Sequence, residues 1–169
     1  MTKRIIFGVL SLIIMAAIFF MSAQSGGISA NISGDVTDAI LARSDDYIAL
    51  DNEQKSEVQE SVGHILRKIA HACEYFALSA SLCLFLFTFK GHVGALSSLA
   101  ALIAFVYACS DELHQTFVPG RSGELADVLI DLAGACLAAL LFGAVCSSSR
   151  KIRAKKEAKR AEALAWLAS

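Results

Sequence analysis

Ionisable and polar residues gather in three short clusters within a strongly apolar chain. The first cluster is Arg67, Lys68, His71, Glu74 and Tyr75. If this segment is an α-helix, its positions advance by about 100° per residue, and the five side chains share an arc of roughly 120°. His71 and Glu74 also lie inside an apolar block, where a charge is costly and commonly functional. This cluster is therefore the first candidate site.

The second cluster stands at the end of a later apolar block. On a continuing helix, Tyr107, Ser110, Asp111 and His114 share an arc of about 100°. Glu112 points roughly 100° away from Asp111 and is a weaker candidate. The pattern predicts a second polar face at the end of this helix.

A loop follows the second cluster. It begins after Gln115 and contains Pro119-Gly120, a pair suited to a tight turn. The residue after this turn is Arg121, which the turn would present to its surroundings. We therefore expect Arg121 to lie over the ends of the neighbouring helices.

The third cluster opens the last apolar block. Asp127 and Asp131 are one helical turn apart and share a face. Gly134 and Ala138 continue that face as a small-xxx-small pair, which lets neighbouring helices approach closely. The pattern predicts that this face packs against another helix.

These residue types suit anion binding and acid–base chemistry. Arg67, Lys68 and Arg121 can bind a phosphate or carboxylate, and an arginine can do so with two parallel hydrogen bonds. HxxE and DExH spacing is a weak metal motif, so the metal and cofactor stay unknown. The candidate catalytic residues are His71, Glu74, Asp111 and His114. The candidate binding residues are Lys68, Tyr75, Ser110, Gln115, Arg121, Asp127 and Asp131.

Long apolar blocks position these clusters. Hydrophobic residues make up 56% of the 169-residue chain and charged residues only 18%, which is more apolar than a typical soluble domain. Four blocks approach the roughly 20 residues that a membrane-spanning helix needs: 5–21, 69–89, 93–109 and 128–146. The sequence predicts an all-α, polytopic membrane protein with four transmembrane helices.

The distribution of Lys and Arg predicts the direction of these spans. With the N-terminus inside, ten of the 15 basic residues lie inside, mainly in the tail 147–169. The C-terminus is then also inside, and residues 22–68 form an outer loop. All three polar clusters meet at the outer leaflet in this arrangement. The basic tail is interpreted as a solvated cytoplasmic segment, or alternatively as a helix lying on anionic lipid.

Two smaller expectations concern the soluble segments. Val58, Val62 and Ile65 recur at helical spacing, so a short amphipathic helix should lead into the second span. The only basic run is the tail beside a membrane span, and nothing in the sequence supports nucleic-acid binding.

The order and spacing of the polar motifs resemble the VanZ-like family of bacterial membrane proteins. The resemblance covers roughly residues 5–146, and the motifs that carry it are Ser22-Ala-Gln24, Lys68-x-x-His-x-x-Glu-Tyr75, Ser110-Asp-Glu-Leu-His-Gln-x-Phe-Val-Pro-Gly-Arg121 and Asp127-Val-Leu-x-Asp131-x-x-Gly134. The family often has Asn where this chain has Asp131, which adds an acid to the site.

The resemblance implies a multi-pass protein of the bacterial cytoplasmic membrane. The founding member is associated with resistance to the glycopeptide teicoplanin. We therefore expect a VanZ-like protein of the cell envelope that binds or modifies a membrane lipid or cell-wall precursor at the outer leaflet.

Other interpretations remain open. The clusters could form a metal-dependent or acid–base enzyme that acts on lipid head groups. They could instead lock the helices together through the ion pairs Asp111–Arg121, Glu74–Lys68 or Asp127–Arg121. A proton relay is the weakest interpretation, because the ionisable residues stop near the outer face and do not continue across the membrane.

Overall fold

The computed structural model describes residues 2–167, and this part of the chain consists of six helices with no strand. The helices are α1 (Thr2–Ser22), α2 (Gly26–Leu41), α3 (Asp45–Ile48), α4 (Asn52–Leu86), α5 (Val93–Gln115) and α6 (Leu125–Leu167). Four of them, α1, α4, α5 and α6, are long and apolar enough to cross a membrane. The predicted all-α protein with four transmembrane helices is confirmed.

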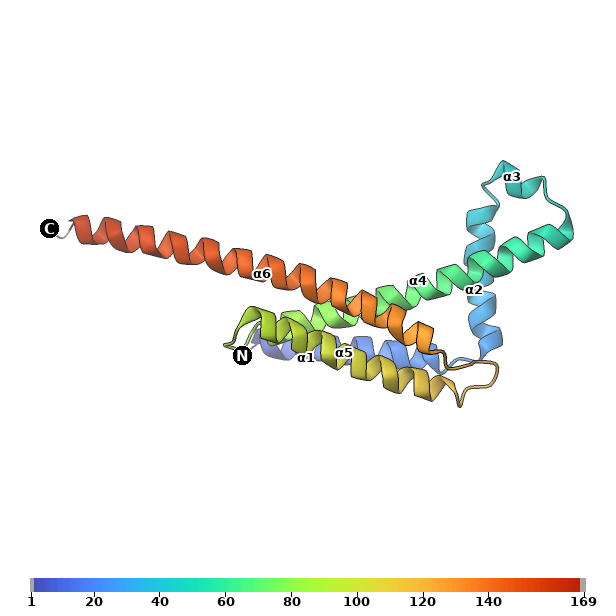
Figure 1. Ribbon diagram of the computed structural model, residues 1–169, viewed down its shortest axis with the longest axis horizontal. Helices are drawn as coiled ribbons and strands as arrows, with labels where there is room; N and C mark the ends of the chain where they lie inside the picture. The colour runs from blue at the N-terminus through green and yellow to red at the C-terminus, as the bar shows by residue number, and fades with distance from the viewer. Residues whose placement is uncertain (1, 168–169) are drawn as a thin grey trace.

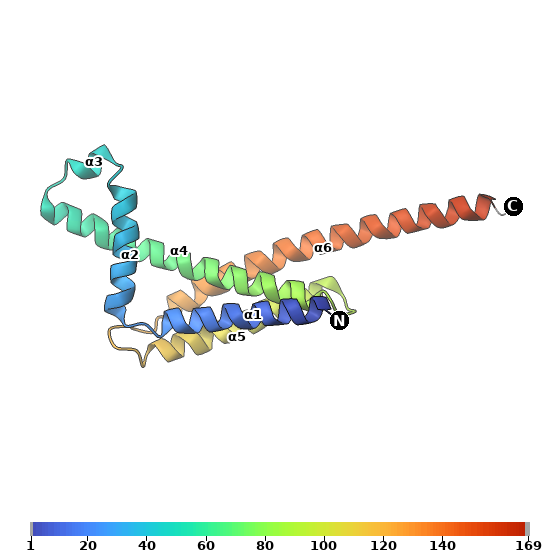
Figure 2. The same cartoon turned by 180° about the vertical axis from the view of Figure 1, so that it is seen from behind.

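The four spanning helices form one elongated bundle, and α2 crosses α4 at one end of it (Figures 1 and 2). Both chain termini lie toward the other end. We call the end that holds the α1–α2 link and the α5–α6 loop the distal end. The polar clusters of the sequence lie toward this end, because α4 enters the bundle there, α5 ends there and α6 begins there.

Small side chains form much of the bundle core. Ala100, Ala104 and Ala108 repeat at every fourth position of α5 and are fully buried. Ala135 and Ala138 of α6 are also fully buried. Helices in a membrane associate mainly through close packing, which small residues at a contact permit. This packing holds α5 and α6 against each other at the level just below the polar residues.

The crossing of α4 and α6 is the closest contact in the bundle core. Gly134 is buried there, and a Cβ built on it would overlap the backbone carbonyl of Ala72. The predicted small-residue face of Gly134 and Ala138 is therefore confirmed as a packing face. Because the two backbones touch at this point, His71, next to Ala72, is brought near Asp131, which lies about one turn before Gly134.

Two helices are longer than the sequence predicted. The short amphipathic helix expected around Val58–Ile65 is the first part of α4, which runs unbroken for 35 residues. Asp51 and Gln54 start α4 with a capping box, in which each side chain accepts a hydrogen bond from the other's backbone N–H. The basic tail likewise continues the last span, so α6 is a single helix of 43 residues.

Arginines hold the turn between α4 and α5 at the end nearest the termini. Arg4 of α1 donates to the carbonyl of Thr88 at 3.2 Å, and Arg150 of α6 donates to that of Gly91 at 2.8 Å. Carbonyls at a helix C-terminus have no partner within the helix, and basic side chains commonly bind them. At the distal end Arg121 likewise binds backbone carbonyls, those of Met21 and Gln24 at the end of α1.

Candidate functional site

The α1–α2 link and the α5–α6 loop meet through two glycines. The backbone N–H of Gly26 donates to the carbonyl of Pro119 at 3.1 Å. Gly120 has φ +74°, a conformation that glycine adopts without strain. A Cβ on Gly26 would overlap the carbonyl of Gly120. The Pro119-Gly120 turn is therefore a docking point for the chain as it leaves α1.

Arg121 follows this turn and fastens the loop to α1. Its Nε donates to the carbonyl of Gln24 at 3.0 Å and its Nη2 to that of Met21 at 3.2 Å. Its Nη1 donates to Oε1 of Gln115 at 3.1 Å, and Gln115 donates to Oδ2 of Asp111 at 3.0 Å. The pairing of Asp111 with Arg121 that the sequence allowed is thus relayed by Gln115. Three of the five N–H groups of Arg121 already have partners.

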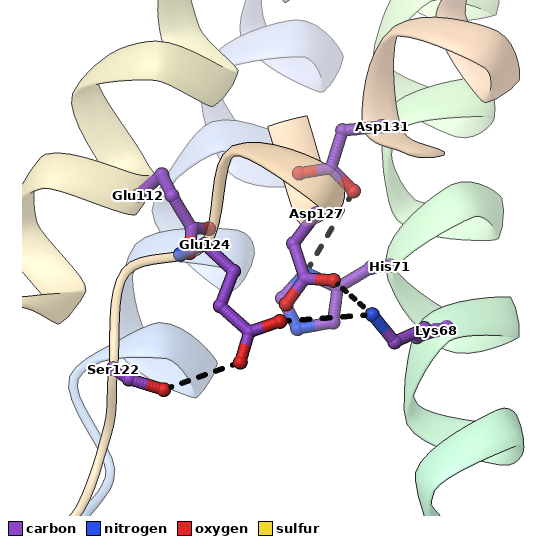
Figure 3. Close-up of polar contacts among 7 residues, drawn as sticks. All are labelled: Lys68, His71, Glu112, Ser122, Glu124, Asp127 and Asp131. Carbon is purple, nitrogen blue, oxygen red and sulfur yellow. Dashed lines mark hydrogen bonds and ion pairs between the residues drawn. The ribbon is translucent and has the colours of Figure 1, made fainter. Parts of the chain in front are cut away.

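Lys68 joins α4 to the start of α6. Its Nζ lies 2.7 Å from Oδ1 of Asp127 and 4.0 Å from Oε2 of Glu124. Both contacts are drawn as dashed lines in Figure 3. The sequence suggested Glu74 as the partner of Lys68, but the described structure pairs Lys68 with these two acids. Glu124, which was not among the candidates, therefore belongs to the site.

Glu112 is a further site residue that the helical wheel ranked too low. Its side chain is buried, and its Oε1 accepts a hydrogen bond from the backbone N–H of Glu124 at 2.6 Å. The first N–H groups of a helix region lack backbone partners, and an acid beside them stabilises the helix start. Glu112 thus helps to fix where α6 begins, and with it the positions of Asp127 and Asp131.

His71 and Asp131 face each other across the contact between α4 and α6. The Nδ1 of His71 lies 3.8 Å from Oδ1 of Asp131, and the Asp131 side chain is only 1% exposed. Neither oxygen of Asp131 accepts a hydrogen bond from any residue in the described range 2–167. In Figure 3 a dashed line joins the carboxylate of Asp131 to the imidazole ring, and Lys68 and Asp127 are drawn next to the ring in this view.

Other buried polar atoms near this pair also lack partners among the described residues. They are the hydroxyls of Tyr75 and Ser22 and the Oδ1 of Asp111. Buried polar groups are nearly always hydrogen-bonded, because leaving one unpaired costs about 1–3 kcal/mol. These unpaired buried atoms gather at the distal end. Helix packing alone does not require so many polar groups there, which indicates a binding or catalytic site.

Two predicted site residues lie elsewhere. The Ser110 hydroxyl is exposed and donates to the carbonyl of Tyr107 in its own helix at 2.7 Å. The His114 ring packs on Phe19 of α1 at 4.8 Å between centroids. The predicted arc on α5 is therefore divided: His114 packs against α1, Ser110 is exposed and Asp111 is buried.

Two cavities open beside His71. The first, which we call the apolar cavity, has a volume of about 330 Å³, and its lining includes Met21, Ser22, Val36, Leu66, Ile69, Ala70 and Glu74. The second, which we call the polar cavity, has a volume of about 170 Å³, and its lining includes His64, Lys68, Gln115, Glu124 and Asp127. Arg67, His71 and Arg121 line both cavities. These three residues therefore stand where an apolar space meets a polar one.

The ligand sets suggested by HxxE and DExH are not assembled. Within residues 2–167, no three His, Cys, Asp or Glu side chains are grouped so that they could hold a metal ion. His114 is turned toward Phe19, as described above, and Glu112 is bound to the backbone of Glu124.

Comparison with known proteins links this site to a family. Residues 7–146 match the family described as VanZ/LLP1. No curated protein and no solved structure matches the chain. The matched segment contains the three polar clusters and the α1–α2 link, and it ends within α6 before the basic tail. The chain is therefore a multi-pass membrane protein that belongs to the VanZ/LLP1 family.

Proposed function

We propose that the protein binds an amphiphile with a phosphate or carboxylate, such as a membrane lipid or a cell-wall precursor, at its distal end. The observation that carries this proposal is the junction of the two cavities at Arg67, His71 and Arg121. An amphiphile would place its hydrocarbon part in the apolar cavity and its charged part in the polar one. The arginines at the junction suit the anionic group between them.

Arg67 is the best candidate for direct contact with that anion. Arg121 uses three of its donors on the chain itself, and Lys68 is paired with Asp127. Arg67 is half-buried, and in the part of the chain that the structure describes it has no hydrogen bond or ion pair. A guanidinium with free donors beside both cavities can bind a phosphate or carboxylate with two hydrogen bonds.

The apolar cavity is accessible from the surface of the bundle. Ile69 and Val36 line it and are 53% and 49% exposed. Ile69 begins the second predicted span and would therefore face the lipid, so that a hydrocarbon chain could enter the cavity beside it. This supports a ligand that arrives from the bilayer.

We further propose that the N- and C-termini lie inside the cell, so that the distal end lies at the outer leaflet of the bacterial cytoplasmic membrane. Residues 147–169 are then a basic cytoplasmic tail, and residues 1–146 form the transmembrane domain. A site for lipid or cell-wall precursor at the outer leaflet agrees with the link between the VanZ-like family and glycopeptide resistance. The basic residues around the α4–α5 turn support this orientation.

Native mass spectrometry with lipids retained tests the binding proposal. The purified protein should carry a lipid or precursor adduct. Arg67→Ala should raise the Kd of that adduct tenfold or more and so lower its occupancy, because a charge-assisted hydrogen bond contributes about 1.5–3 kcal/mol. Arg153→Ala, in the exposed tail, is the matched control and should retain the adduct. Equal adduct occupancy in the two variants, or no adduct in the unaltered protein, would count against the proposal.

A further inference from the structure

His71 occupies a position that anion binding does not require. It lines both cavities, and its side chain is 23% exposed. Its Nδ1 is turned toward Asp131, which leaves Nε2 as the nitrogen available to a bound molecule. An amphiphile that fills both cavities would place next to His71 the bond that joins the apolar part of the amphiphile to its polar part.

Asp131 has no role as a partner in the other contacts of the site. Glu112 binds the backbone of Glu124, Asp127 binds Lys68 and Asp111 binds Gln115. Asp131 is almost fully buried, and within the described residues the group that it faces is the imidazole of His71. Its distance of 3.8 Å is longer than a hydrogen bond, as is common for catalytic groups before substrate binds. A buried carboxylate behind an imidazole fixes the ring and stabilises its protonated form.

From this geometry we propose that His71 and Asp131 hydrolyse a carboxylic ester between the apolar and polar parts of a phosphate-bearing amphiphile. The inference rests on the proposed function, because the amphiphile must first occupy both cavities. His71 is the catalytic residue and Asp131 is a positioning residue that acts through it.

The reaction adds one water molecule across the ester. The water oxygen attacks the carbonyl carbon while its proton passes to Nε2 of His71. The tetrahedral intermediate carries an oxyanion, which the free N–H groups of Arg67 or Arg121 can stabilise. As the intermediate collapses, the carbon–oxygen bond to the alcohol breaks and His71 returns the proton to the alkoxide. The products are a fatty acid and the alcohol that carries the phosphate, and no other reactant is consumed.

The arrangement of groups suits carbonyl chemistry better than attack at phosphorus. Displacement at phosphorus requires the attacking and leaving oxygens to lie in line on opposite sides. His71 and Glu74 come from adjacent turns of the same helix and line the same cavity. One imidazole can act first as base and then as acid on a single side of an ester carbonyl.

Vesicles of phosphatidylglycerol provide the test, with the full chain reconstituted in them and free fatty acid measured over time. The unaltered protein should release fatty acid, and His71→Ala should lower the rate by about 10²–10⁴-fold, the usual contribution of general acid–base catalysis. Asp131→Asn keeps the shape of the side chain and should lower kcat while leaving KM unchanged. Arg153→Ala should behave as the unaltered protein.

An ether-linked phosphatidylglycerol separates this inference from the binding proposal. It has the same phosphate and apolar chains but no ester, so it should bind to the unaltered protein and to Asp131→Asn without being cleaved. Retention of the ether lipid together with no more fatty acid than His71→Ala releases would overturn the hydrolysis and leave binding intact. Failure to retain either lipid would overturn the proposed function and this inference with it. A parallel rise in KM and loss of ether-lipid binding in Asp131→Asn would show that Asp131 supports the fold only.

Discussion

Replacing Gly134 with alanine is expected to lower the thermal midpoint of the protein by about 4–8 °C, the shift that a net loss of about 2 kcal/mol produces in a chain of this size. The new methyl group would overlap the backbone carbonyl of Ala72, and a backbone atom has no alternative rotamer to adopt. Overpacking of this kind costs about 1–3 kcal/mol, and here the two helices must move apart. The gain of about 1 kcal/mol in helix propensity does not compensate for it. Circular dichroism of the detergent-purified protein during heating measures the change.

A graded glycine series controls this prediction. A Cβ on Gly34 in α2 would meet no atom within 4 Å, and one on Gly8 in α1 would lie 3.3 Å from the Phe85 ring. Gly34→Ala should leave the midpoint unchanged or raise it slightly, and Gly8→Ala should have a small effect. If all three variants melted at the same temperature, the contact between α4 and α6 would not be as close as described. Gly134→Ala should also move Asp131 away from His71.

Arg121→Lys is expected to destabilise the protein nearly as much as Arg121→Ala, by about 2 kcal/mol. Arg121 donates in three directions, to the carbonyls of Met21 and Gln24 and to the side chain of Gln115. A lysine ammonium preserves the charge, but it is a single point that cannot reproduce the planar geometry of a guanidinium. The loss corresponds to unpaired acceptors at the end of α1, each of which costs about 1 kcal/mol or more.

The comparison of these two variants separates structure from ligand binding. Thermal unfolding should show nearly equal losses for Arg121→Lys and Arg121→Ala, whereas Arg67→Ala should melt like the unaltered protein, because Arg67 has no bond to another described residue. If Arg121→Lys retained full stability, the contacts with α1 would contribute little and Arg121 would be mainly a ligand-binding charge.

The spanning helices were predictable from sequence because the membrane imposes their composition. A helix across lipid needs a long apolar run, and that run is visible without any knowledge of packing. The other helical segments were harder to predict: α2 and α3 were not predicted, and a helix was only one of two interpretations of the tail. The residues of α2 and the tail of α6 do not carry a clear apolar period, although the Ala, Lys, Arg and Glu of the tail favour helix formation.

The sequence predicted which candidate residues share a face of one helix. It predicted less well which residues of different helices contact each other. The spacing of His71 and Glu74 predicted that the two share a helical face, and both line the apolar cavity. The partner of Lys68 depended on where α6 begins, which Glu112 fixes through the backbone of Glu124. Arg121 binds mainly backbone carbonyls, which every residue carries and no sequence pattern displays.

The unbroken course of α6 has a mechanical consequence. A helix of 43 residues is about 65 Å long, roughly twice the thickness of the hydrocarbon core. Its first turns carry Asp127 and Asp131, and its last turns project beyond the opposite end of the bundle (Figure 1). A stiff rod converts a small tilt at one end into a larger displacement at the other. A spectroscopic probe attached to the tail would therefore move farther than Asp131 does when α6 tilts, and would report small movements of Asp131 relative to His71.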